Sequence, residues 1–239
     1  MDIKYNVLRF KEEKQEEIKD HVSVEEPLEM NLRFKKNGRW IVENLSITMR
    51  TPGNDKSLIS GFLFNERIIE NFSEIVKIEK KGDKVGDYNI QNKIEATIDN
   101  IKNIDIGKLK RNFVTNSSCG VCGKTSLDTI EIIKNEKLNL TFPKIKKEII
   151  MMSPKLLINE QSEFSKTGGI HASSLIDNLG KIILTMEDVG RHNALDKLIG
   201  SSLKNNLIDN HSQFIACSGR LNYELIQKGL MSNIAIMAG

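Results

Sequence analysis

The sequence has little of what marks several large classes of protein. It contains three cysteines, four prolines and one tryptophan in 239 residues. No stretch approaches the roughly 18 consecutive apolar residues that span a membrane, and the N-terminal stretch lacks the apolar core of a secretory signal peptide. We therefore expect a cytoplasmic protein that does not enter the membrane. In that compartment cysteines are reduced, catalytic or metal-bound rather than paired in structural disulfides.

The charge balance is also modest. The net charge of +3 is too small to indicate a general nucleic-acid-binding protein, although a local basic patch for a small anion stays open. Hydrophobic residues make up 39% and charged residues 28% of the chain, which is typical of a folded protein with a real core. No phosphate-loop motif and no Rossmann Gly-x-Gly-x-x-Gly motif occurs.

Periodicity predicts an α/β protein in two parts. Residues 39–49 alternate as a strand, and the break between Val42 and Leu45 indicates a bulge. The last third reads as strand, helix, strand, helix at 181–186, 191–203, 213–217 and 223–231, which predicts a sheet covered by helices. A further helix is expected to begin at Ser153 and Pro154. The charged residues 1–30 predict a loosely anchored arm or an edge strand. We divide the chain into a β-rich lobe, 1–142, and an α/β half, 143–239.

Three glycine-bearing junctions in that second half are candidate anion sites. They lie at 167–171, 187–193 and 217–220, and the last two follow predicted strands. Glycine lets a backbone approach an anion closely, helix N-termini offer N–H groups, and arginine adds a bidentate contact to phosphate. Taken singly, each junction is better explained as a turn with a helix cap and a solvated arginine. Three within about 55 residues favour a ligand that carries phosphate or a nucleotide.

Two of the three cysteines, Cys119 and Cys122, lie in the loop "SSCGVCGK" (117–124). A Cys-x-x-Cys pair can bind a metal, cycle as a disulfide or present a reactive thiolate. A structural zinc site would have to recruit Cys217 or the distant His171 and His192, because no second such pair exists. Lys124 and a following helix would favour the thiolate, so sulfur chemistry fits at least as well as metal.

A zinc deaminase is excluded by motif order. That chemistry needs His-x-Glu, with the glutamate as proton shuttle, followed later by Pro-Cys-x-x-Cys. In this chain Ser173 stands where the glutamate belongs, no proline precedes Cys119, and the two motifs occur in reverse order.

Taken together, the motifs resemble the FdhD family, the accessory sulfurtransferases of formate dehydrogenase. The matching segments run in the family's order from Arg50 onward and are "RTPGNDKSLISGFLFNERII" (50–69), "SSCGVCGK" (117–124), "FSKTGGIHASSL" (164–175), "EDVGRHNALDKLIG" (187–200) and "CSGRLNYELIQKGLMSNI" (217–234). Family members usually continue past "AIMAG", through another helix and strand to a Gly/Arg-rich end. This chain is therefore expected to lack that segment and to expose a sheet edge.

The resemblance implies a cytidine-deaminase-like sheet flanked by helices, without zinc or another structural metal, in a homodimer. It implies a sulfurtransferase that accepts persulfide sulfur from a cysteine desulfurase on Cys119, with Cys122 assisting. The sulfur then passes to the molybdenum cofactor, bis(molybdopterin guanine dinucleotide), that is destined for formate dehydrogenase. By motif position and anion chemistry we expect the cofactor pocket to be lined by Gly168, Gly169, His171, Asp188, Arg191, His192, Ser218 and Arg220.

Two other interpretations stay open at this point. The chain could be a cofactor-binding chaperone of formate dehydrogenase that does not need its cysteines. It could also be a structural protein stabilised by a metal at the cysteine pair.

Overall fold

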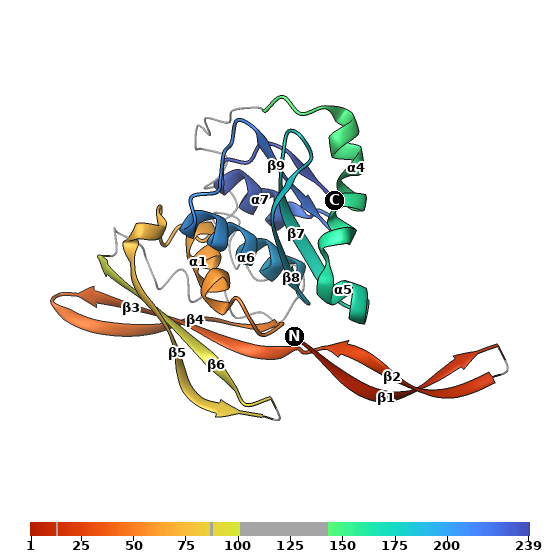
Figure 1. Ribbon diagram of the computed structural model, residues 1–239. Coiled ribbons are helices and arrows are strands. Elements are labelled where there is room, and N and C mark those ends of the chain that lie inside the picture. Colours follow the sequence, from red (N-terminus) through yellow and green to blue (C-terminus); the bar gives the residue numbers. More distant parts are fainter. Residues whose placement is uncertain (13, 87, 101–142) are drawn as a thin grey trace.

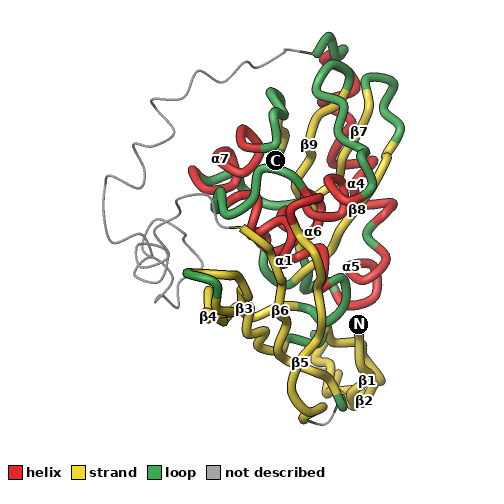
Figure 2. The backbone as a smooth tube through the Cα atoms, turned by 90° about the vertical axis from the view of Figure 1, so that its left-hand side faces the viewer, coloured by secondary structure: helices red, strands yellow, loops and turns green. Residues whose placement is uncertain are grey.

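The computed structural model describes residues 1–12, 14–86, 88–100 and 143–239, and it places two four-stranded sheets on opposite sides of a layer of helices (Figure 1). Viewed from the side, α1 (Asp55–Asn65) and α6 (Arg191–Lys204) lie between the two sheets (Figure 2). This arrangement confirms the mixed α/β class. The closer likeness to cytidine deaminases stays a prediction.

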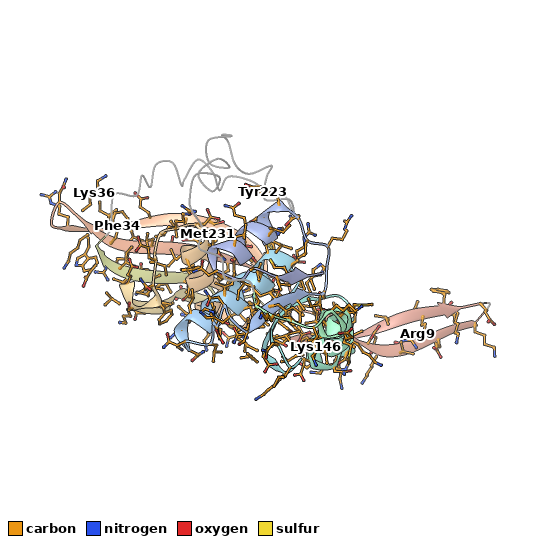
Figure 3. The ribbon with its side chains drawn as sticks, turned by 90° about the horizontal axis from the view of Figure 1, so that it is seen from above. Arg9, Phe34, Lys36, Lys146, Tyr223 and Met231 are labelled. Atoms are coloured by element: carbon orange, nitrogen blue, oxygen red, sulfur yellow. The ribbon has the colours of Figure 1, made fainter. Side chains whose placement is uncertain are left out.

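The N-terminus forms a two-stranded arm that projects from the body (Figure 1). Strand β1 (Asp2–Lys11) pairs antiparallel with β2 (Lys14–Ser23). The base of the arm is held by Ser23 Oγ, which donates to Thr167 Oγ1 at 2.8 Å at the end of α5 (Ser162–Thr167), and further along β1 the hydroxyl of Tyr5 lies 3.2 Å from the hydroxyl of Tyr88. Seen from above, Arg9 on the arm lies at one end of the molecule, opposite the tip of β3 (Figure 3).

The first sheet has the strand order β4-β3-β6-β5 and belongs to the N-terminal part of the chain. Its strands are β3 (Glu26–Lys36), β4 (Arg39–Arg50), β5 (Ile75–Val85) and β6 (Ile90–Asn100), with helix α1 (Asp55–Asn65) and a short 3₁₀ helix (Phe72–Glu74) between β4 and β5. One face of this sheet packs on α1, where Leu28, Leu32 and Ile94 meet Leu58 and Leu63 in a single apolar core.

The bulge predicted in β4 is confirmed. Met30 pairs with Ser46 and Asn31 with Asn44, so Leu45 is the extra residue. Leu45 is buried on α1. Ile41 is partly buried against the same core, whereas four other apolar positions face solvent, because within the described residues a helix packs on one face of this sheet only. They are Trp40, Val42, Ile47 and Met49.

The second sheet has the order β10-β9-β7-β8 and carries helices on both faces. Its strands are β7 (His171–Asp177), β8 (Ile182–Asp188), β9 (Gln213–Cys217) and β10 (Met237–Ala238), and its helices are α4 (Lys147–Glu160), α5 (Ser162–Thr167), α6 (Arg191–Lys204) and α7 (Tyr223–Met231). Leu195 of α6 and Leu225 of α7 pack on one face, and Ile149 of α4 packs on the other. The strands and helices predicted for the last third of the chain are thus confirmed.

The start of α4 is where the sequence interpretation was wrong. The helix begins at Lys147 and runs through Pro154, which was expected in its first turn. A proline inside a helix removes one backbone hydrogen bond. Here Ile149, before the proline, packs against the sheet, and Leu157, after it, is buried, so α4 is anchored on both sides of Pro154.

Helices α1 and α6 cross at two glycines. A Cβ atom on Gly61 would overlap the carbonyl oxygen of Asp196, and a Cβ atom on Gly200 would overlap the carbonyl oxygen of Ser57. The helix backbones therefore touch directly, and this contact joins the first sheet to the second. The predicted boundary between residues 142 and 143 falls at the edge of the part that the structure does not describe, so the division into 1–142 and 143–239 stays a prediction.

We expect Gly200→Ala to lower the free energy of unfolding by about 2–3 kcal/mol through overpacking at the helix crossing. The sign of this change in unfolding free energy tests the close crossing, because alanine in place of a helical glycine ordinarily stabilises a protein by about 1 kcal/mol. Denaturant unfolding of the purified variant measures the change. Gly169→Ala is the matched control, since a Cβ there comes no closer than 3.9 Å to its neighbours. A Gly200→Ala variant more stable than the parent would contradict the close crossing.

Candidate functional site: an anion-binding edge of the second sheet

Four strand ends meet at one edge of the second sheet. Strand β7 runs antiparallel to β8 and to β9, with His171 opposite Asp188 and Ser173 opposite Cys217. The start of β7 therefore lies beside the ends of its two neighbours, and β10 runs parallel to β9 and ends at the same edge. The three glycine-bearing junctions are thus brought together, although up to 50 residues separate them in the sequence.

The first junction enters β7 from α5. Gly168 ends the helix with a φ of 66°, a conformation that favours glycine, and its N–H donates to Phe164 O at 2.7 Å. Gly168 and Gly169 are both exposed, and the half-buried His171 follows them. The backbone at this entry is therefore bare enough for close approach by a ligand.

The second junction turns from β8 into α6. Gly190 is the N-cap residue, so Arg191 and His192 occupy the first turn of a 14-residue helix. The N-terminus of a helix carries a partial positive charge, and an arginine there adds a full one. This end of α6 is the most favourable place for an anion along the edge.

The third junction follows β9. Ser218 N donates to Ala172 O and Ser218 Oγ accepts from Ala172 N, both at 2.9 Å, which fixes this turn to the start of β7. A Cβ atom on Gly219 would lie 3.2 Å from His171 Nδ1 and 4.0 Å from Arg191 Cδ. Residues of all three junctions therefore meet around Gly219. Arg220 is exposed beside them.

The protonation state of His171, at the point where the three junctions meet, depends on its burial and on the nearby Arg191. Burial lowers the pKa of His171, the arginine lowers it further, and Asp188 opposes the shift. His171 is therefore mainly neutral at pH 7 in the ligand-free protein. A bound anion would favour the protonated ring, which makes this histidine sensitive to occupancy of the site.

Asp188 lies beneath the edge and is fully buried. Its carboxylate pairs with Lys197 Nζ at 2.6 Å and accepts from Thr51 N at 3.2 Å, Gly190 N at 2.9 Å and Asn193 Nδ2 at 3.1 Å. Both carboxylate oxygens are thus engaged by the protein. In this structure Asp188 holds the 187–193 turn in place, and its predicted contact with a cofactor stays untested.

His192 points into a neighbouring polar cluster on α7. Its Nε2 lies 3.0 Å from Asn222 Nδ2 and 3.3 Å from Glu224 Oε2. Burial lowers the pKa of His192 and Glu224 opposes that shift. Behind it, burial alone would lower the pKa of Lys228, but Asp196 and Glu224 more than offset this and raise it. His192 thus links the site to α7, and a direct role with a ligand is a prediction.

Lys197 and Thr51 are structural partners of the site that sequence reasoning missed. Besides its pair with Asp188, Lys197 Nζ donates to Thr51 O at 2.8 Å, and Val189 N donates to Thr51 Oγ1 at 3.1 Å. Lys197 lies off the apolar stripe of its helix, which runs through Ala194, Leu195, Leu198 and Ile199, so the sequence pattern places it on the polar face and only the structure shows it buried. Nothing local in the sequence could connect Thr51 to residues more than 130 positions away.

Both cysteines of the predicted sulfur loop, Cys119 and Cys122, lie outside the described residues. Cys217 ends β9 as a buried thiol near Ser173 Oγ, and burial raises its pKa. Such a thiol is a poor nucleophile. Within the described ranges, no three His, Cys, Asp or Glu side chains gather as a metal site.

Comparison with known proteins identifies the relatives of this chain. Residues 24–239 match the FdhD/NarQ family model. The chain belongs to the FdhD/NarQ family. Among its curated relatives, the sulfur carrier protein FdhD of Saccharolobus solfataricus is 36% identical over 236 residues, covering 99% of this chain and 83% of the relative. The sulfur carrier protein FdhD of Streptomyces avermitilis is 37% identical over 222 residues, covering 92% and 76%.

A solved structure supports the fold of this family member. The crystal structure of a protein from Desulfotalea psychrophila, assigned provisionally as a formate dehydrogenase accessory protein, superposes with a TM-score of 0.70. It is 22% identical, and the match covers 99% of this chain and 82% of that one. No helix in the described part of the chain is long and apolar enough to cross a membrane.

We expect Lys197→Met to lower the free energy of unfolding by about 3–5 kcal/mol, because it leaves the carboxylate of Asp188 buried without its cation. The double variant Lys197→Met/Asp188→Asn removes that uncompensated charge and should recover a large part of the loss. Denaturant unfolding of the two single variants and the double variant completes the thermodynamic cycle. Effects that simply add would show that the two residues do not act as a pair.

Proposed function

We propose that this chain is a sulfur carrier for the maturation of formate dehydrogenase. It accepts persulfide sulfur from a cysteine desulfurase and passes it to the bis(molybdopterin guanine dinucleotide) form of the molybdenum cofactor. The observation that carries the proposal is the meeting of His171, Arg191 and Gly219 at one sheet edge, in a chain whose family includes curated sulfur carrier proteins. An edge of this kind suits a large acceptor that carries several phosphates.

The sulfur step is thiol exchange. The thiolate of Cys119 attacks the outer sulfur of the donor persulfide, the donor's S–S bond breaks, and the donor leaves as a thiolate. Cys119 then holds that sulfur as its own persulfide, with no net oxidation or reduction. For delivery, the thiolate of Cys122 attacks the inner sulfur of the Cys119 persulfide, a Cys119–Cys122 disulfide forms, and the outer sulfur leaves as hydrosulfide for the cofactor; a thiol reductant then restores both cysteines.

In the acceptor step, the anionic parts of the cofactor bind at this sheet edge. Arg191 and the N-terminus of α6 bind a phosphate, and Arg220 contributes a second positive charge. The bare backbone at Gly168 and Gly169 admits the ligand, and Ser218 keeps the third junction against β7. His171 adds a hydrogen-bond donor, and a positive charge when it is protonated.

The same proposal includes the partners and the assembly. Formate dehydrogenase is the recipient of the loaded cofactor, the chain works as a homodimer, and it does so in the cytoplasm. A chaperone that binds the cofactor but does not carry sulfur is the competing function. The anion-binding edge alone would serve that function equally well, so Cys119 decides between the two.

We expect wild-type protein to gain mass in steps of one sulfur after incubation with a cysteine desulfurase and cysteine, and to lose it on reduction. Cys119→Ala should not retain this sulfur, and it should not restore formate dehydrogenase activity in cells that lack the native protein. Intact-protein mass spectrometry and the activity assay measure the two effects. Cys217→Ser is the matched control and should load normally, because its thiol is buried. A Cys119→Ala variant that still supports the dehydrogenase would establish the chaperone instead.

Guanosine diphosphate serves as the probe of the acceptor site. We expect Arg191→Gln to weaken its binding about tenfold to a hundredfold, the loss of a charge-assisted hydrogen bond. Lys204→Gln, at the far end of the same helix, should leave binding unchanged. Because the pKa of His171 is lowered in the free protein and a bound anion raises it, binding should strengthen as the pH falls from 7.5 to 6.

The pH effect is measured by calorimetry on wild type and His171→Gln. The difference between the two curves isolates the histidine from the titration of the phosphate itself. Two curves with the same pH dependence would remove His171 from the site.

A further inference from the structure

The outer face of β4 carries an apolar stripe that the proposed site does not use. Trp40, Val42, Ile47 and Met49 are 42%, 52%, 64% and 48% exposed. Strand β4 is an edge of its sheet, and within the described residues it pairs only with β3. Exposed edge strands are usually protected by charged side chains. An apolar stripe of this kind marks an interaction surface.

The bulge at Leu45 creates this stripe. Val42 lies opposite Arg33 and Ile47 lies opposite Glu29, so the two apolar side chains share the outer face of the sheet. Strict alternation from Val42 would instead bring Ser46 and Thr48 to that face. The extra residue thus turns Leu45 into the core and realigns the second half of the strand.

The order of apolar and polar side chains on the outer face of β4 is the same in both directions along the strand. The outward-facing positions of β4 are Trp40, Val42, Asn44, Ile47 and Met49, and they lie opposite the evenly spaced residues 35, 33, 31, 29 and 27 of β3, so two apolar side chains lie on either side of Asn44. An interface between identical chains related by a two-fold axis requires such self-complementarity, whereas an unrelated partner does not. Tryptophan at the end of the stripe is also a residue type enriched where binding energy concentrates. Arg33 and Lys35 lie 4.7 and 4.8 Å from its ring centroid.

We propose that β4 is the contact between two copies of this chain, with the two strands antiparallel about a two-fold axis that passes beside Asn44, so that Asn44 lies opposite Asn44 of the second copy. In this register Trp40 packs against Met49 of the second copy, and Val42 packs against Ile47 of the second copy. The inference rests on the homodimer in the proposed function and names its surface. It does not depend on sulfur transfer or on the bound anion.

The first test is sedimentation of wild type, Ile47→Lys and a matched control over a range of protein concentrations. Ile47→Lys should raise the dissociation constant of the dimer at least about tenfold, because each dimer would then bury two lysines against apolar side chains. Val76→Lys is the control, since Val76 is 60% exposed on β5 at the other edge of the same sheet. It should leave the dimer intact, and circular dichroism checks that both variants fold.

The second test fixes the register by disulfide cross-linking in a Cys119→Ser/Cys122→Ser background. Val42→Cys and Ile47→Cys are prepared separately. An oxidised equal mixture of the two should yield cross-linked dimer, because these positions face each other across the axis, and each variant alone should yield far less. Serine at both loop positions also removes the sulfur chemistry, so the result is independent of whether the chain carries sulfur.

Three outcomes would overturn the proposal. Wild type could remain a monomer at all concentrations. A dimer could persist in Ile47→Lys and give no cross-link in the mixture. Alternatively, Phe10→Lys, on the arm where Phe10 is 71% exposed, could dissociate the dimer while Ile47→Lys does not, which would assign the contact to the arm.

Discussion

The buried ion pair between Lys197 and Asp188 is the interaction on which the site depends. It lies where the end of β4, the end of β8 and the first turns of α6 converge, and each of these segments bonds to it. Thr51 contributes its N–H to the aspartate and its carbonyl oxygen to the lysine. A buried ion pair contributes little net stability in many proteins, but loss of one partner is severe. The pair therefore acts as a constraint on the position of the turn that presents Arg191.

The two glycines at the helix crossing act at a larger scale. With Gly61 and Gly200 in contact with opposing backbone, α1 of the first sheet lies directly on α6 of the second. The N-terminus of α6 is therefore positioned by both sheets. Asn193 extends this connection, because it bonds to Asp188 and to the carbonyl oxygen of Met49 at the end of β4. The proposed anion-binding edge and the end of the exposed stripe of β4 are thus joined by one polar network.

Much of the site could be predicted from the sequence, because its signals are local. A glycine, a following arginine and a helix start within a few residues indicate an anion site wherever the strand before them ends. What could not be predicted is which of these residues lie at the exposed edge and which are buried beneath it as structural supports. Asp188 and Arg191 are three positions apart, yet one is buried beneath the edge and the other lies at it. His192 turns instead toward Asn222 and Glu224. These differences arise from packing against segments distant in sequence.

The sequence by itself determined β8, α6, β9 and α7 of the last third, though not the central strand β7, together with the bulge in β4, the three junctions and, through its motifs, the family. Each of these depends on residues close together in the chain. Only the tertiary structure decided that the junctions share one sheet edge, since strand order brings them together, and that Lys197 and Thr51 support it. It also decided that four apolar residues of β4 face outward. Alternation marks two faces of a strand, but which face is buried depends on where α1 packs.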